Sequence, residues 1–282
     1  MATTIAPPQS APQQTEETRH RAIIFQDVSL TFDAKVVLDH VSFELFRGET
    51  KILLGEAGVG KSTILKLALG LLKPDSGSIF ALGHEVSAMK ENDLFELRRK
   101  IGMVFQESAL FDSLTVHDNV AYRLMEEGDV SEEEIESRVR EALRFVELEH
   151  TLNLFPSELS GGMRRRVAIA RAIITQPEVI LYDSPTGGLD PVTSTTIIEL
   201  LLKQRDVSHT SALMVTHRLQ DAFVMATHCF DRSRNEMRPV APGEKVDVRT
   251  SFVILRDAHI IFDGTASELI AVKDPYIREY IS

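Results

Sequence analysis

The chain has little cysteine, a deficit of basic residues and no long hydrophobic run. Its one thiol, Cys229, excludes an internal disulfide and fits a reducing compartment, and its simplest interpretation is a small buried or loop residue without chemistry. Lys and Arg number 31 against 42 Asp and Glu, a net charge of -11. Such a surface should repel nucleic acid and anionic lipid headgroups, so we expect no nucleic-acid partner.

The absence of a continuous apolar segment predicts that the chain does not insert into a membrane. No window holds 18 uncharged apolar residues, and the first residues lack the basic and apolar regions of a signal peptide. Any membrane role is therefore expected to come through a partner. The nine histidines lack metal-ligand spacing, which predicts no structural zinc.

The composition is that of a globular protein, with 43% apolar and 26% charged residues over 282 positions. This length predicts one large or two small domains. Residues 1 to about 20 are rich in Pro, Gln, Thr and Ala and predict a disordered tail. The polar segment from about 231 to 250 contains two prolines and predicts a surface loop insertion.

A phosphate-binding loop lies at 55–63. Gly55, Gly60, Lys61 and Ser62 fill every fixed position of the G-x-x-x-x-G-K-[ST] pattern, between an apolar strand and a helix. Backbone N–H groups of such a loop and the helix dipole hold phosphate oxygens. We expect Lys61 to reach the β- and γ-phosphates of a nucleotide triphosphate and Ser62 to ligate Mg²⁺. The remaining residues of the predicted loop are Glu56, Ala57, Gly58, Val59 and Thr63.

Asp183 is the expected second ligand of Mg²⁺. It ends the apolar run 179–182, an arrangement that can deliver a carboxylate beside a phosphate loop. Because apolar runs ending in Asp are common, a structural role is the alternative when this run is taken alone.

The order of apolar and polar segments predicts an α/β fold. Short strands are expected between 22 and 45, with polar turns between them, and another at 78–82, which together form an antiparallel sheet. The stretch 91–155 reads as helical. Beyond it, helices alternate with buried strands, which indicates parallel βα units around one sheet. A hairpin over 252–262 and a last helix starting at Thr265 close the chain.

The segment Leu159-Ser160-Gly161-Gly162-Met163 lies between the phosphate loop and Asp183, and with it the chain resembles the ATP-binding cassette (ABC) ATPases, whose signature is LSGGQ or a near variant. Alone, the turn could be only a helix N-cap. The resemblance runs from about residue 22. It implies a P-loop NTPase fold of the ABC type over 21–282, with an N-terminal antiparallel β subdomain, a RecA-like parallel core and a helical subdomain inserted at about 107–160.

The resemblance also implies roles for single residues. Phe32 matches the aromatic that stacks on adenine, with a core strand aromatic as the alternative. Gln106 matches the Q-loop glutamine that senses Mg²⁺ and water, Asp190 lies in the D-loop match, and His217 matches the switch histidine on the γ-phosphate. In the family two subunits enclose two ATP molecules, so the turn at 160–162 is expected to complete the phosphate loop of a second copy of the chain.

Position 184 departs from the family pattern. A glutamate normally follows the magnesium aspartate and orients the attacking water, but here Ser184 stands there. A serine hydroxyl cannot accept a proton at neutral pH, and losing a general base typically costs about 10² to 10⁴ in rate. We expect ATP binding with weak hydrolysis. Slow natural turnover, pairing with an intact partner and a substitution introduced to trap ATP are three explanations that the sequence leaves open.

Three segments resemble the Mla-type ATPases: Met163 with the arginines that follow it, residues 108–121 and the ending 274–281. These ATPases energise phospholipid movement together with a permease and an MCE-domain protein. The resemblance implies a motor subunit at the cytoplasmic face of a bacterial inner membrane. The apolar residues of 109–114 would receive the permease or, alternatively, belong to the core of the helical subdomain. A small-solute importer and a non-hydrolysing regulatory module are the alternative functions.

Overall fold

The computed structural model describes residues 21–241, 244 and 249–282. The predicted tail over residues 1 to about 20 therefore lies outside the described residues, as do positions 242–243 and 245–248 of the predicted surface loop.

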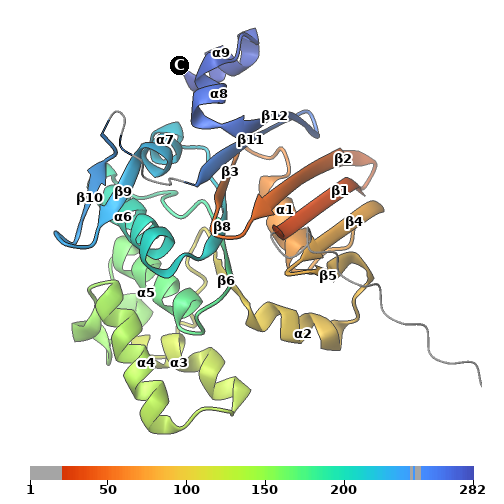
Figure 1. Ribbon diagram of the computed structural model, residues 1–282. Helices are drawn as coiled ribbons and strands as arrows, with labels where there is room; N and C mark the ends of the chain where they lie inside the picture. Colours follow the sequence, from red (N-terminus) through yellow and green to blue (C-terminus); the bar gives the residue numbers. More distant parts are fainter. Residues whose placement is uncertain (1–20, 242–243, 245–248) are drawn as a thin grey trace, which may run out of the picture.

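An antiparallel sheet opens the described chain, as predicted (Figure 1). Its strands are β1 (Arg21–Phe32), β2 (Lys35–Phe46), β4 (Ser76–Ala81) and β5 (His84–Glu85), in the order β2-β1-β4-β5. The polar interruptions expected to be turns within 22–45 are in part irregularities of two long strands. Asp27 lies at a register shift and has φ 53, and His40 on the partner strand has φ 51. The two side chains meet across the strands at 2.7 Å, so the chain bulges there rather than turning.

The central sheet holds six strands in the order β12-β11-β3-β8-β7-β6. From β11 to β6 all neighbours pair in parallel, whereas β12 is antiparallel to β11, which confirms both the parallel core and the closing hairpin. The strands are β3 (Thr50–Leu54), β6 (Ile101–Val104), β7 (Val179–Asp183), β8 (Ser211–Val215), β11 (Thr250–Arg256) and β12 (His259–Thr265).

Alternate residues of the central strands face two separate cores. Ile52, Tyr182 and Met214 point to the side covered by α3 to α7, whereas Leu53, Leu181 and Leu213 point toward α1 and the antiparallel sheet. Burial on both faces explains why these strands read as continuous apolar runs.

Helices and short helical turns cover these layers (Figure 1). The α-helices are α1 (Lys61–Ala68), α2 (Glu91–Arg99), α3 (Val116–Glu127), α4 (Glu132–Phe145), α5 (Gly161–Ile173), α6 (Pro191–Ser208), α7 (Leu219–Thr227), α8 (Ala266–Ala271) and α9 (Pro275–Ile281). The 3₁₀ turns are η2 (Val86–Ala88), η3 (Glu149–Thr151) and η4 (Pro156–Glu158). Figure 1 shows α3 and α4 at one end of the molecule and α8 and α9 at the other.

Three elements differ from the sequence-based expectation. β6 lies inside the stretch 91–155 that reads as helical. β10 (Glu236–Pro239) lies inside the segment expected to be a surface loop and pairs with β9 (His228–Asp231), which precedes that segment. The helix after Thr265 begins with the predicted capping box to Glu268, but α9 follows it and is the true last helix. Short strands with few alternating residues give weak patterns, which accounts for the two missed strands.

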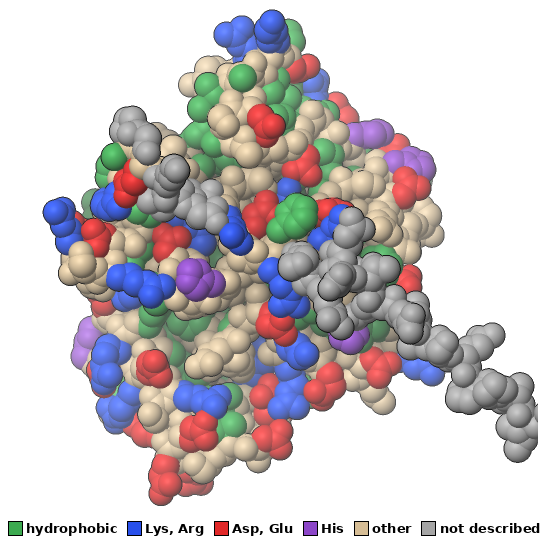
Figure 2. Space-filling model, viewed as in Figure 1, with side chains coloured by type: hydrophobic (Ala, Val, Ile, Leu, Met, Phe, Trp, Pro, Cys, Tyr) green, Lys and Arg blue, Asp and Glu red, His purple; other side chains and the backbone are tan. Residues whose placement is uncertain are grey.

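Charges of both signs are interspersed over the face drawn in Figure 2, and Lys and Arg form no continuous patch on that face. Cys229 is buried on β9, as its simplest interpretation required, and burial raises the pKa of its thiol. Over the described ranges, the structure contains no helix with the length and apolarity needed to span a bilayer.

Candidate nucleotide site

The parallel pairing of the central strands brings the predicted site residues to one edge of the sheet. Gly55 directly follows β3, Ser184 directly follows β7, and Gln106 and His217 lie two residues beyond β6 and β8. Because parallel strands have their carboxyl ends at the same edge, positions far apart in the sequence converge there.

The phosphate loop is shaped by glycines that no other residue could replace without strain. Gly60 caps α1 with φ 103, and a Cβ at this position would lie 2.9 Å from Val37 Cγ1. At Gly55 a Cβ would lie 2.4 Å from the carbonyl oxygen of Leu255. The loop is therefore held tightly between β2 and β11, with its backbone free to approach a ligand.

Lys61 is a buried cation at the start of α1. Its Nζ donates to the carbonyl oxygens of Gly55 at 2.8 Å and Glu56 at 2.6 Å. Burial lowers the pKa of this amine, and the charges of Asp183 and Glu56 oppose that shift. Since both hydrogen-bond partners are neutral carbonyls, an anionic phosphate would be a stronger partner for the ammonium group.

Ser62 and Asp183 meet across the site. The Ser62 hydroxyl donates to Asp183 Oδ1 at 3.0 Å, although the two residues lie far apart in the sequence. A hydroxyl and a carboxylate oxygen are hard ligands of the kind that Mg²⁺ takes together with water and phosphate oxygens. The pair therefore fits a magnesium ion bound beside the loop.

A cavity of about 550 Å³ joins most of the predicted residues. This volume lies within the range of small-ligand sites, about 300 to 1,000 Å³. Phe32 stands at its rim with 42% of its surface exposed, so the alternative of a core strand aromatic is wrong. The predicted residues that line it are Phe32, Ala57, Gly58, Gly60, Lys61, Ser62, Thr63, Gln106, Ser184 and His217.

The signature turn and Asp190 do not line this cavity. Ser160 caps α5 by accepting a hydrogen bond from Met163 N at 3.2 Å, and Asp190 caps α6 by accepting one from Thr193 N at 3.0 Å. A Cβ on Gly162 would lie 2.4 Å from Thr193 Cγ2, so these two helix starts are packed together. A single copy of the chain therefore keeps the signature turn and Asp190 apart from the cavity.

Ser184 has a constrained backbone. Its φ of 47 is left-handed, its N–H donates to Val215 O at 2.9 Å, and its carbonyl accepts from Gly187 N at 2.9 Å. Its hydroxyl lies at the cavity, where it can donate a hydrogen bond but cannot serve as a base at neutral pH.

Some residues at the site were not predicted from the sequence to belong to it. Lys35 and Val37 of β2 line the cavity, and Tyr280 of α9 accepts a hydrogen bond from Gly55 N at 2.9 Å. Tyr276 donates to Glu56 Oε1 at 3.2 Å. The i, i+4 spacing of the two tyrosines is the one sequence signal that could have placed them on a common helix face.

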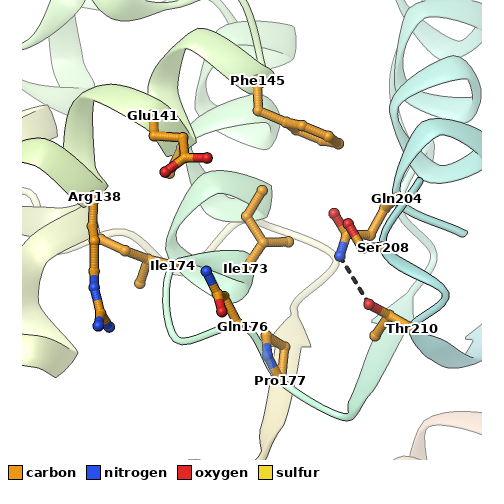
Figure 3. Close-up of a pocket in the computed structure, with 11 residues that line it drawn as sticks. Arg138, Glu141, Phe145, Ile173, Ile174, Gln176, Pro177, Gln204, Ser208 and Thr210 are labelled. Atoms are coloured by element: carbon orange, nitrogen blue, oxygen red, sulfur yellow. Dashed lines mark hydrogen bonds between the residues drawn. The ribbon is translucent and has the colours of Figure 1, made fainter. Parts of the chain in front are cut away.

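Two other cavities lie apart from these residues. One, of about 400 Å³, lies between α4, α5 and α6, and Figure 3 shows Gln204 donating to Thr210 at 3.0 Å within it. The other is an apolar groove of about 630 Å³, which we call the aromatic groove. It is defined by the exposed side chains of Leu71, Phe95, Phe105, Phe111 and Tyr122.

Similarity to known proteins shows the family to which the chain belongs. The family described as ABC transporter matches residues 38–187. The intermembrane phospholipid transport system ATP-binding protein MlaF of Escherichia coli K12 is 32% identical over 94% of this chain and 90% of its own length. Protein TRIGALACTOSYLDIACYLGLYCEROL 3 of Arabidopsis thaliana is 44% identical over 90% of this chain and 72% of its own length.

Relatives with a different named function also match the chain. The methionine import ATP-binding protein MetN of Rhizobium meliloti is 40% identical over 71% of this chain and 57% of its own length. Among solved structures, the dimeric bacterial ABC transporter cassette MJ0796 has a TM-score of 0.71 and 30% identity, and the match covers 86% of this chain and 98% of that one. The chain therefore belongs to the ABC transporter family, as an ATP-binding subunit that resembles the Mla-type ATPases.

Proposed function

We propose that the chain is the ATP-binding motor of an ABC transporter that moves phospholipid in a bacterial envelope, with hydrolysis slowed by Ser184. The observation that carries the proposal is the single cavity that joins Lys61, Ser62, Gln106, Ser184 and His217, in a chain similar to MlaF over 94% of its length.

In the proposed site, each side chain has a task that follows from its chemistry. Lys61 holds the β- and γ-phosphates, Phe32 stacks on adenine, and His217 contacts the γ-phosphate. Ser62, Asp183 and Gln106 would hold Mg²⁺, which supplies charge neutralisation at the phosphate oxygens. Hydrolysis then lacks a carboxylate at position 184 to orient the water.

The active unit in this proposal is a dimer of the chain. Ser160, Gly161, Gly162 and Asp190 lie outside the cavity and would complete the phosphate site of the second copy. N–H groups at the start of α5 suit contact with a phosphate anion. The dimeric arrangement of the MJ0796 cassette supports this assembly.

The aromatic groove is the surface proposed to receive the permease. Phe95, Phe105, Phe111 and Tyr122 are each more than one third exposed and gather beside Gln106 of the nucleotide site. An exposed apolar groove of this kind marks an interaction site. Movement of the Gln106 loop on ATP binding would thereby reach a membrane subunit, so the chain would act at the cytoplasmic face of the inner membrane.

The lipid substrate and an MCE-domain partner are proposed from the similarity to MlaF. Similarity to MetN favours a small-solute importer as the second candidate. Purification of the native complex through a tag on this chain, followed by lipid extraction and mass spectrometry, separates them. Co-purification of a permease and an MCE-domain protein with bound phospholipid is expected. A solute-import permease, or no membrane partner at all, would contradict the proposal.

A further inference from the structure

Arg165 is a buried cation at the nucleotide site to which the proposed reaction assigns no task. It lies on α5, the helix that begins at the signature turn, and only 4% of its surface is exposed. A buried guanidinium is costly unless its N–H groups find acceptors, so its partners identify what it holds in place.

The Arg165 guanidinium bridges two turns of the site. Nη1 donates to the carbonyl oxygen of Ser184 at 2.9 Å, and Nη2 donates to the carbonyl oxygen of Gln106. Nη2 also approaches the carbonyl oxygen of Gly187 at 3.4 Å, and Nε donates to Ser108 Oγ at 3.3 Å. One side chain thus contacts the Gln106 turn and the Ser184 turn together.

Both turns contain a residue in a conformation that side chains rarely adopt. Ser184 has φ 47 and Ser108 has φ 67. Left-handed conformations of residues other than glycine persist only when surrounding contacts hold them. Arg165 supplies such contacts on both sides.

The surroundings of Arg165 act on its pKa in two directions. Burial lowers the pKa of its guanidinium, while the negative charges of Asp183 and Glu107 act in the opposite direction. Because the ordinary pKa of arginine is far above neutrality, the group remains a cation there.

We propose that Arg165 is a positioning residue of the ATPase reaction, which links the start of α5 to the Gln106 turn and the Ser184 turn so that the three move together. A partner's nucleotide bound at Ser160 would then act through the helix on the residues that hold Mg²⁺ and water. The role of this link in catalysis rests on the proposed function.

Hydrogen exchange on the full chain tests the link directly, with Arg165→Lys as the variant. Lysine keeps the charge but has one nitrogen, which cannot serve both turns in the planar geometry of the guanidinium. The reporters are Ser108 N, which donates to Phe105 O at 3.0 Å, and Gly187 N, which donates to Ser184 O at 2.9 Å. We expect exchange to quicken at least about fivefold in peptides covering both turns.

A matched control is Arg205→Lys. Arg205 is also buried, at 5% exposure, and donates to the carbonyl oxygens of Met225 and His228, which belong to neither the Gln106 turn nor the Ser184 turn. Its substitution should leave exchange in the two turns unchanged. If Arg165→Lys leaves either turn unchanged, or if Arg205→Lys has the same effect, the inference is wrong.

A kinetic measurement separates positioning from folding. In a Ser184→Glu background, Arg165→Lys should lower kcat at least about tenfold while the affinity for ATP stays within about threefold. Equal loss of affinity and rate, or no change in kcat, would contradict a positioning role. A chain that binds no ATP in any variant would instead overturn the proposed function, and the exchange result would still decide whether Arg165 holds the two turns.

Ser108→Ala provides a second variant if Arg165→Lys does not fold. It removes only the acceptor of Nε, and we expect faster exchange in the Gln106 turn with a smaller change at Gly187. Unchanged exchange in both turns would count against the inference.

Discussion

At the scale of single residues, the proposed reaction assigns Ser184 to hydrolysis and not to the binding of ATP. The phosphate loop, the Ser62–Asp183 pair at 3.0 Å and the cavity contact of His217 do not depend on the side chain at 184. The backbone of Ser184 is held by Val215 O and Gly187 N, and the residue lines the nucleotide cavity.

Ser184→Glu should therefore raise the steady-state rate of ATP hydrolysis at least about tenfold, because a positioned general base contributes about 10² to 10⁴ in rate. Phosphate release by the purified chain measures this. Lys61→Ala in the same background serves as the control and should abolish the gain, since it removes the cation that holds the phosphates. A brisk wild-type rate that the glutamate does not change would refute the assignment of position 184.

Gly60→Ala tests the shape of the phosphate loop. A methyl group would meet Val37 Cγ1 at 2.9 Å at a residue with φ 103. We expect a loss of about 1 to 3 kcal/mol in the free energy of unfolding and at least about tenfold weaker ATP binding, measured by chemical denaturation and calorimetry.

The matched control for Gly60→Ala is Gly128→Ala, at the end of α3. Gly128 has φ 69, but a Cβ there would meet nothing within 4 Å. It should cost about 1 kcal/mol and leave ATP binding intact. Equal effects of the two substitutions on ATP binding would show that close packing of the loop is irrelevant.

At the scale of elements, the C-terminal helix α9 supports the start of the phosphate loop. Tyr280 accepts from Gly55 N at 2.9 Å, and Tyr276 lies under Arg256, whose Cζ is 3.8 Å from the ring centroid. Burial raises the pKa of the Tyr280 hydroxyl.

Tyr280→Phe should lower the free energy of unfolding by about 1 kcal/mol, because it leaves the Gly55 N–H without its acceptor. Tyr276→Phe is the control, since its hydroxyl bonds only to the exposed Glu56 side chain and should cost much less. Thermal unfolding of both variants decides the matter. A larger loss for Tyr276→Phe would contradict the supporting role given to Tyr280.

The elements that the sequence predicted are those with strong local patterns. The strand before Gly55, the apolar run ending at Asp183 and the capping box at Thr265 each rest on a recognisable local motif. β6 and β10 were missed because each has only four residues. The bulge at Asp27 was predicted to be a turn because a bulge and a turn each interrupt an apolar run in the sequence. Arg165 and Tyr280 act through tertiary contacts, and the sequence pattern does not identify the partners in those contacts.

At the scale of the whole molecule, a single copy of the chain keeps the nucleotide cavity and the signature turn apart. The cavity with Lys61 lies at the carboxyl ends of the central strands, whereas Ser160 and Asp190 cap the starts of α5 and α6 outside it. In the proposed dimer, each ATP would be held by the loop of one copy and the signature turn of the other. Slow hydrolysis would then prolong the closed dimer.

Light scattering during size exclusion, with Mg²⁺ and ATP present, tests this account most directly. The wild-type chain of 31.5 kDa should elute at about twice its mass with ATP and as a monomer without nucleotide. Ser184→Glu should return to the monomer as its ATP is consumed, and Lys61→Ala should never dimerise. A wild-type chain that stays monomeric with bound ATP, or a Ser184→Glu dimer that persists equally long, would contradict the account.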